Sequence, residues 1–206
     1  MLFRSTAPVP VGATSSYLSS VSCASTTACW AGGLANVSGV SGVLLLRWNG
    51  TTWSLGTPPA PNPGTTSNRI EGIDCVSATS CWAVGYATLG STLDRVMMRW
   101  NGTAWAKVTP PLPVGTTRSL LYGVSCSAAS ACWAAGQYNT SGDGFPLMLR
   151  WNGSTWAPVT APSPVGSTST EVRGVSCPSA TFCMAAGRAF IGGRSEEHTS
   201  ELQSHH

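Results

Sequence analysis

The sequence predicts an all-β fold made of repeated, four-stranded antiparallel units. Three observations carry this prediction. Cysteines recur as four C-x5-C pairs spaced 52, 51 and 51 residues apart, and the heptapeptide R-W-N-G-[ST]-x-W recurs with the same period. Short apolar segments are separated by turns rich in Gly, Pro, Ser and Thr. No segment longer than two turns has the 3.6-residue periodicity of a helix, so we expect no helix.

Each copy of the repeat contains four strand signals, which the first copy illustrates. Residues 18–23 form the first, a polar turn follows, and residues 29–33 form the second. The third and fourth, residues 43–48 and 51–55, flank an Asn-Gly dipeptide. Asn-Gly between apolar runs is a strong hairpin signal, because a type I′ turn needs positive φ at both central residues.

We therefore predict three structural turns, at Asn49-Gly50, Asn101-Gly102 and Asn152-Gly153. In the first copy, a two-residue turn places Trp48 opposite Thr51 and Leu46 opposite Trp53. The two indoles then become diagonal neighbours on one face of the hairpin.

Four strands in about 51 residues, a kelch-like period, is typical of a β-propeller blade. Proline-rich residues 58–63, 110–113 and 158–164 cannot continue a central strand and are expected to be linkers. We predict that residues 1–193 form one partial β-propeller of three and a half blades. The expected blades span residues 18–57, 70–109, 121–160 and, in part, 172–193.

The pattern G-V-S-C…C-W-A-x-G…R-W-N-G-T-T-W resembles the Asp-box repeat of sialidase-type (BNR-like) β-propellers. It also resembles secreted bacterial repeat proteins of the "CWAVG…WNGTSW" type. The resemblance covers residues 5–193 and implies a turn remote from the family's binding face. Asn49, Asn101 and Asn152 stand where the family has its Asp. No catalytic residue is therefore carried over.

The C-terminal segment differs from the repeat. Residues 194–205, RSEEHTSELQSH, resemble the translated read-through of a common sequencing adapter. We expect residues 194–206 to be artefactual and disordered, and both ends of the chain to be truncated. All three histidines lie in this segment, so residues 1–193 contain none.

The cysteine pairs predict disulfides. Zinc sites usually combine C-x2–4-C pairs, often with His, and a catalytic thiol needs a base, so neither metal nor nucleophile is expected. Opposed cysteines on a hairpin fit a local bridge. The predicted bridges are Cys23–Cys29, Cys75–Cys81, Cys126–Cys132 and Cys177–Cys183. Such bridges indicate an extracellular or cell-surface protein, with its signal peptide lost by truncation.

Charged residues make up only 9% of the chain and the net charge is +3, which does not favour nucleic acid as a partner. No apolar stretch is long enough to predict a membrane span. We expect specificity in the segments that vary between copies, residues 34–42, 86–95 and 137–145. The candidate binding residues are Tyr86, Asp94, Tyr138 and Asp143.

Two recurrent residue types have alternative interpretations. Arg47, Arg99 and Arg150 could form anion contacts, but their fixed position favours stacking on indoles. Trp30, Trp82 and Trp133 follow the second cysteine of each pair, where core packing is expected more often than exposed stacking on sugars.

The sequence thus favours a non-catalytic extracellular domain that binds glycan or protein or serves structural display, without a cofactor. Its other partners would be the missing blades of its own chain. The alternative is part of a carbohydrate-active, sialidase-like hydrolase or lyase, whose active site the missing blades would complete. An acid such as Glu71 or Asp74 beside an Arg on the central face would favour this alternative. An inert spacer would have no charged or aromatic cluster.

Overall fold

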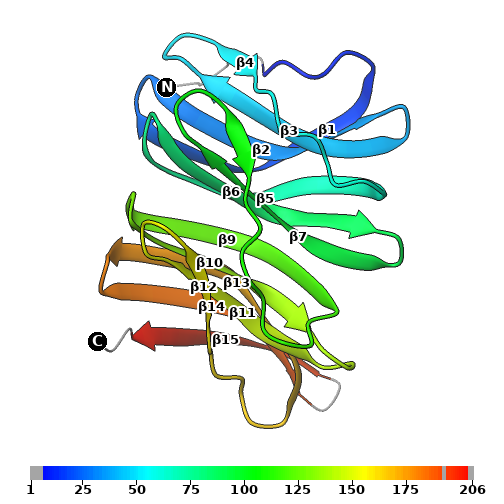
Figure 1. The fold of residues 1–206 in the computed structure, drawn as a ribbon, viewed down its shortest axis with the longest axis vertical. Helices are drawn as coiled ribbons and strands as arrows, with labels where there is room; N and C mark the ends of the chain where they lie inside the picture. The colour runs from blue at the N-terminus through cyan, green and yellow to red at the C-terminus, as the bar shows by residue number, and fades with distance from the viewer. Residues whose placement is uncertain (1–6, 192–193, 204–206) are drawn as a thin grey trace.

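The computed structural model describes residues 7–191, together with the backbone of residues 194–203. Every helix or strand within these residues is a β-strand, as the sequence predicts. Figure 1 shows the strands as successive layers along the longest axis of the molecule, from β1 at one end to β15 at the other. In the part of the chain that the structure describes, no helix could span a membrane.

The strands group into four units, each with one copy of the repeat. Unit 1 contains β1 (Ala13–Ser25), β2 (Ala28–Val37), β3 (Val40–Trp48) and β4 (Trp53–Leu55). Unit 2 contains β5 (Thr65–Ser77), β6 (Ser80–Leu89), β7 (Thr92–Trp100) and β8 (Trp105–Lys107). Unit 3 contains β9 (Arg118–Ala128), β10 (Ala131–Asn139), β11 (Gly144–Trp151) and β12 (Trp156–Val159). Unit 4 contains β13 (Ser167–Ser179), β14 (Phe182–Ile191) and β15 (Arg194–Gln203).

Within a unit, consecutive strands pair antiparallel. A single parallel bridge, Ser41 with Ser67, joins unit 1 to unit 2, and Gly144 with Ser169 joins unit 3 to unit 4. The result is two mixed sheets of eight and seven strands. The first strands of successive units, β1, β5, β9 and β13, contact one another in order, so they form a shared inner column.

One glycine position explains the close pairing of the first and second strands. It lies four residues after the second cysteine of each pair and is occupied by Gly33, Gly85, Gly136 and Gly187. A Cβ atom there would overlap a carbonyl oxygen of the neighbouring first strand, such as that of Tyr17 beside Gly33. The G of the C-W-A-x-G motif is therefore a packing requirement.

The turn of the repeated heptapeptide differs from its prediction. Trp48 pairs with Trp53 across a four-residue turn, so the predicted type I′ turn and its register are wrong. Of the turn residues, only Gly50 has a positive φ, 99°. Asn49 Oδ1 accepts hydrogen bonds of 2.9 Å from the backbone N–H groups of Thr51 and Thr52. The asparagine side chain thereby satisfies the wider turn.

Compared with the predicted pairing, the observed one is shifted by two residues. A shift of two residues keeps the side chains of each strand on the same face, and it makes the two indoles direct neighbours. The ring centroids of Trp48 and Trp53 lie 5.5 Å apart. The indole N–H of Trp48 donates to the carbonyl of Thr26, 3.0 Å away in the cysteine hairpin. Trp100 and Trp151 make the same bond to Ala78 and Ala129. Each indole therefore ties the outer hairpin of a unit to its cysteine hairpin.

The units pack through groups of three tryptophans. Trp30 of unit 1 inserts against the Trp100–Trp105 pair of unit 2, with centroids 4.8 and 5.2 Å away. Trp82 of unit 2 packs in the same way on Trp151 and Trp156 of unit 3. Trp30, Trp82 and Trp133 are all buried, so stacking on sugars is excluded for them.

The repeated arginines stack on these indoles. The guanidinium carbon of Arg47 lies 5.4 Å from the ring centroid of Trp100, and that of Arg99 lies 5.4 Å from that of Trp151. Arg150 lies 5.9 Å from Trp133. Stacking, rather than a ring of anion contacts, is therefore the role of this position.

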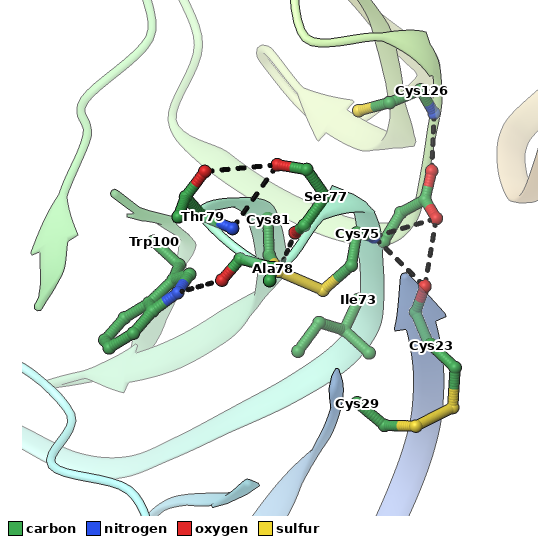
Figure 2. Close-up of a disulfide and its surroundings, with 12 residues drawn as sticks. Cys23, Cys29, Ile73, Cys75, Ser77, Ala78, Thr79, Cys81, Trp100 and Cys126 are labelled. Atoms are coloured by element: carbon green, nitrogen blue, oxygen red, sulfur yellow. Dashed lines mark hydrogen bonds between the residues drawn. A yellow bond between two sulfur atoms is a disulfide. The ribbon is translucent and has the colours of Figure 1, made fainter. Parts of the chain in front are cut away.

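All four predicted disulfides form. In unit 2, Cys75 and Cys81 are directly opposed, with Cα atoms 4.0 Å apart. Figure 2 shows this bridge between the Cys23–Cys29 bridge of unit 1 and Cys126 of unit 3. The described residues contain no free cysteine. Each bridge closes the turn between the first and second strands of its unit.

The residue before the first cysteine links neighbouring units. The Cys75 N–H donates to Ser22 Oγ at 3.0 Å, and the Cys177 N–H donates to Ser125 Oγ at 3.0 Å. At the junction between them, Asp74 Oδ2 accepts from the Cys126 N–H at 2.6 Å. Asp74 therefore joins first strands together and is a structural residue.

The C-terminal segment forms a strand where the sequence predicts disorder. Strand β15 pairs with β14 from Ile191–Arg194 to Phe182–Gln203. The physical reason is the free edge of β14, whose backbone N–H and C=O groups need partners. In units 1 to 3, the corresponding groups of the second strand pair with the third strand of the same unit. β15 takes the position of that third strand.

Candidate functional site

The four candidate binding residues do not converge on one site. Tyr86 lies on β6 and Asp94 on β7, while Tyr138 lies on β10 and Asp143 in the exposed turn before β11. Tyr86 is the fifth residue after its second cysteine and Tyr138 is the sixth. Because side chains alternate along a strand, these two tyrosines point to opposite faces of their units.

A polar and aromatic cluster crosses the inner column and includes Tyr86. We call it the Arg–Tyr–Glu strip, and its members come from β1, β5, β6, β9, β13 and β14. They are Tyr17, Arg69, Glu71, Tyr86, Tyr122, Glu171, Arg173 and Arg188.

One end of the strip is organised by Arg69. Its Nη1 donates to the hydroxyl of Tyr17 in unit 1, at 3.0 Å. Its guanidinium carbon lies 4.5 Å from the ring centroid of Tyr86, and Nη1 lies 3.7 Å from Oε1 of Glu71. Arg69 thus connects an aromatic ring, a hydroxyl and a carboxylate from two units.

The other end is organised by Glu171, whose side chain is only 6% exposed. Its Oε1 accepts from Nε of Arg173 at 2.8 Å and from Nε of Arg188. Its Oε2 accepts from the Tyr122 hydroxyl at 3.3 Å. Arg173 also stacks on the Tyr122 ring, with 4.8 Å between the guanidinium carbon and the centroid.

The two ends meet at an edge-to-face contact between Tyr86 and Tyr122, whose centroids lie 6.1 Å apart. Burial raises the pKa of Tyr86. Burial, reinforced by the charge of Glu171, raises the pKa of Tyr122 to about 12. Both phenols are therefore protonated at neutral pH, and the Tyr122 hydroxyl donates to Glu171.

The outward groups of the strip are guanidiniums. The Arg173 and Arg188 side chains are 53% and 40% exposed. Each binds Glu171 through Nε, and within the part of the chain that the structure describes their terminal Nη groups have no protein acceptor. These groups are available to a ligand that carries hydroxyl or carboxylate oxygens.

Sequence reasoning identified two residues of this strip, Tyr86 as a candidate binding residue and Glu71 as an acid that would favour a hydrolase if it lay beside an arginine, as it does beside Arg69. A signal was present, because the positions six and four residues before the first cysteine differ in every copy. The first holds Tyr17, Arg69, Leu120 and Glu171, and the second holds Ser19, Glu71, Tyr122 and Arg173. Two residues apart on a strand, these positions share a face.

Asp94 and Tyr138 line two clefts that use corresponding positions of units 2 and 3, the second being formed by unit 3 with Pro113 of the preceding linker and Thr160 and Ala161 of the following one. The first junction cleft, between units 1 and 2, has a volume of about 230 Å³ and contains Asp94 and Lys107. The second has about 290 Å³ and contains Tyr138 and Phe145, whose rings stack at 5.4 Å. Neither cleft shares a lining residue with the strip. Among the described residues, no group of acidic, His and Cys side chains could hold a metal ion.

No protein-family model matches the chain, and no curated protein matches it by sequence. The fold is similar to that of the SapL1 lectin, solved with alpha methyl fucoside, with a TM-score of 0.54 and 11% identity over 92% of this chain and 65% of the lectin. It is similar to the GH74 xyloglucanase from Xanthomonas campestris, with a TM-score of 0.50 and 11% identity over 81% of this chain and 26% of the enzyme.

A third similar structure is YCF48 from Cyanidioschyzon merolae, with a TM-score of 0.41, 11% identity, and coverage of 94% of this chain and 73% of that one. This chain spans less than two thirds of the lectin and about a quarter of the xyloglucanase. The lectin and the xyloglucanase are both propellers, and the fold of this chain is accordingly of the β-propeller type.

Proposed function

We propose that this chain is an extracellular glycan-binding domain in which units 1 to 3 are complete propeller blades and unit 4 is a partial one. Four disulfides support the extracellular location. The Arg–Tyr–Glu strip is the observation that carries the binding role, because charged and aromatic side chains converge there from all four units. The lectin and xyloglucanase folds make a carbohydrate ligand the natural choice.

The charge of the strip selects the class of glycan. Three guanidiniums face two carboxylates, and Glu171 is already bound by two of the three arginines. The surplus is positive and lies on the exposed Nη groups of Arg173 and Arg188. An acidic glycan such as an oligogalacturonide offers the carboxylates that these groups bind in pairs.

Binding to oligogalacturonide tests this proposal, measured by isothermal titration calorimetry. Arg188→Gln removes one pair of exposed Nη groups and should weaken binding about tenfold, the effect of losing one charge-assisted hydrogen bond. Arg118→Gln is the matched control, because Arg118 is exposed on β9 outside the strip. Equal affinity of the two variants would argue against the strip as the glycan site.

A hydrolase is the second candidate, and one observation favours it. Tyr122 and Glu171 are hydrogen-bonded beside two arginines, and Glu71 lies beside Arg69. Against catalysis, the raised pKa of Tyr122 makes its phenolate scarce at neutral pH, and both oxygens of Glu171 are engaged. Turnover of 4-methylumbelliferyl glycosides that Tyr122→Phe abolishes would establish an enzyme; no turnover with a full panel would reject it.

A further inference from the structure

The first junction cleft is a separate feature from the Arg–Tyr–Glu strip, and its walls are largely apolar. Val43 of unit 1 faces Val96 and Met98 of unit 2, and the proline-rich linker between β4 and β5 forms a further wall. Proline fixes the backbone φ, so this wall is stiff before any ligand arrives. Such walls suit the C–H face of a ring.

Asp94, Arg95 and Lys107 bring charge to this apolar cleft. Arg95 is bound through Nη1 to Asp94 and through Nη2 to the Pro110 carbonyl, so Asp94 and Lys107 are the charged groups with polar atoms left for a ligand. Asp94 Oδ1 accepts from the backbone and Nη1 of Arg95 and from Ser119 Oγ. Its Oδ2 has no protein donor among the described residues, and the Asp94 side chain is 34% exposed. Lys107 Nζ donates to Asn62 Oδ1 at 2.8 Å, which leaves two of its three N–H donors for a ligand.

The repeat shows that the second junction lacks this chemistry. Asp94 and Phe145 occupy the same position, six residues before the third-strand tryptophan. Lys107 and Pro158 likewise share the position two residues after the fourth-strand tryptophan. The second junction cleft therefore has a ring and a proline where the first has a carboxylate and an ammonium group.

The combination selects a neutral, polyhydroxylated ligand. Asp94 disfavours a ligand that carries a carboxylate, and Lys107 disfavours a ligand that carries an amine. The hydroxyl groups of a neutral ligand can donate to Asp94 and accept from Lys107. A volume of about 230 Å³ lies below the roughly 300–1,000 Å³ of sites for drug-sized ligands, so it suits one ring.

We propose that the first junction cleft binds one neutral sugar ring, with its hydroxyls on Asp94 and Lys107 and its C–H face on the valine, methionine and proline wall. This inference rests on the proposed glycan-binding function and adds a second site with a different specificity. The strip takes the acidic residue of a glycan, and the cleft takes a neutral one.

The test is saturation-transfer NMR of the 206-residue chain with methyl glycosides of galactose, glucose, mannose and xylose. At least one neutral glycoside should give saturation of its ring C–H protons. Asp94→Asn keeps an acceptor for Arg95 but replaces the open oxygen with an amide nitrogen, and should weaken binding about tenfold. Lys107→Met should also weaken binding of the neutral glycoside about tenfold.

Two controls separate this site from others. Arg118→Gln removes a charge at an exposed position outside both sites and should leave binding unchanged. Arg188→Gln should weaken oligogalacturonide binding and leave the methyl glycosides unaffected. Hexanoate serves as an apolar probe without a sugar ring. If hexanoate is saturated and no methyl glycoside gives a signal, the inference is overturned. It is also overturned if Asp94→Asn binds the glycoside as tightly as the wild type. Oligogalacturonide binding without neutral-sugar binding would reject the cleft alone and leave the strip standing.

Discussion

At the scale of single residues, tryptophans at different positions of the repeat have different surroundings. Trp82 is only 1% exposed and packs edge-on against both Trp151 and Trp156, each 5.0 Å away. Trp53 has one indole neighbour, Trp48, and remains partly exposed. The tryptophans of the repeat are therefore not expected to contribute equally to the free energy of unfolding.

Trp82→Ala should lower the free energy of unfolding by about 3–5 kcal/mol, because it leaves a cavity in a packed junction. Trp53→Ala is the matched control and should cost less, since part of the Trp53 side chain is already in water. Urea unfolding followed by tryptophan fluorescence and circular dichroism measures both. Equal losses for the two variants would contradict the packing role of the three-tryptophan groups.

Tyr122 makes the stability depend on pH in the alkaline range. Its pKa rises from 10.0 to about 12 in the folded chain, because of burial and the charge of Glu171. Folding therefore favours the protonated phenol. This contribution is complete below pH 10 and is lost as the pH rises through about 12. Melting temperatures measured from pH 9 to 12 should fall more steeply for the wild type than for Tyr122→Phe.

At the scale of elements, the Asn-Gly hairpins depend on a side-chain acceptor. Asn101 Oδ1 accepts from the backbone N–H groups of Thr103 and Ala104, both at 2.9 Å. Either an amide or a carboxylate oxygen can fill this role, so an aspartate at this position would support the turn equally well.

Asn101→Ala should destabilise the chain by about 1–2 kcal/mol, because two turn N–H groups lose their acceptor. Asn101→Asp retains the acceptor and should stay within about 0.5 kcal/mol of the wild type. Chemical denaturation of the three proteins gives the comparison. A large loss in Asn101→Asp would show that the amide N–H₂, rather than the oxygen, supports the turn.

The accuracy of the sequence predictions follows from how local each feature is. The Cys75–Cys81 bridge depends on spacing within one hairpin, and the spacing predicts it. The register at Trp48 depends on which groups the Asn49 side chain accepts from, so the dipeptide alone gave the wrong turn. The Arg–Tyr–Glu strip joins residues from four units, and only a comparison of equivalent positions across the copies could have indicated it.

At the scale of the whole molecule, no described unit packs on the side of unit 1 where units 2 and 3 each have a neighbour. The Trp48–Trp53 pair receives no third indole from the described residues, unlike the pairs of the next two units. On the first strand of the same unit, β1, Val21 is 61% exposed and Leu18 is 43% exposed. This surface has the apolar character of a junction between units but is open to water.

We therefore expect the purified chain to self-associate through unit 1. The mean mass from sedimentation velocity should rise with protein concentration, because each association event removes the exposed apolar side chains of β1 from water. Replacing both Leu18 and Val21 with Lys should lower the mass toward that of a 21.3 kDa monomer. Lysine at Val40, which is 56% exposed on β3, is the control for added charge alone. A wild-type chain that stays monomeric at all concentrations would show that the open face of unit 1 is no junction surface.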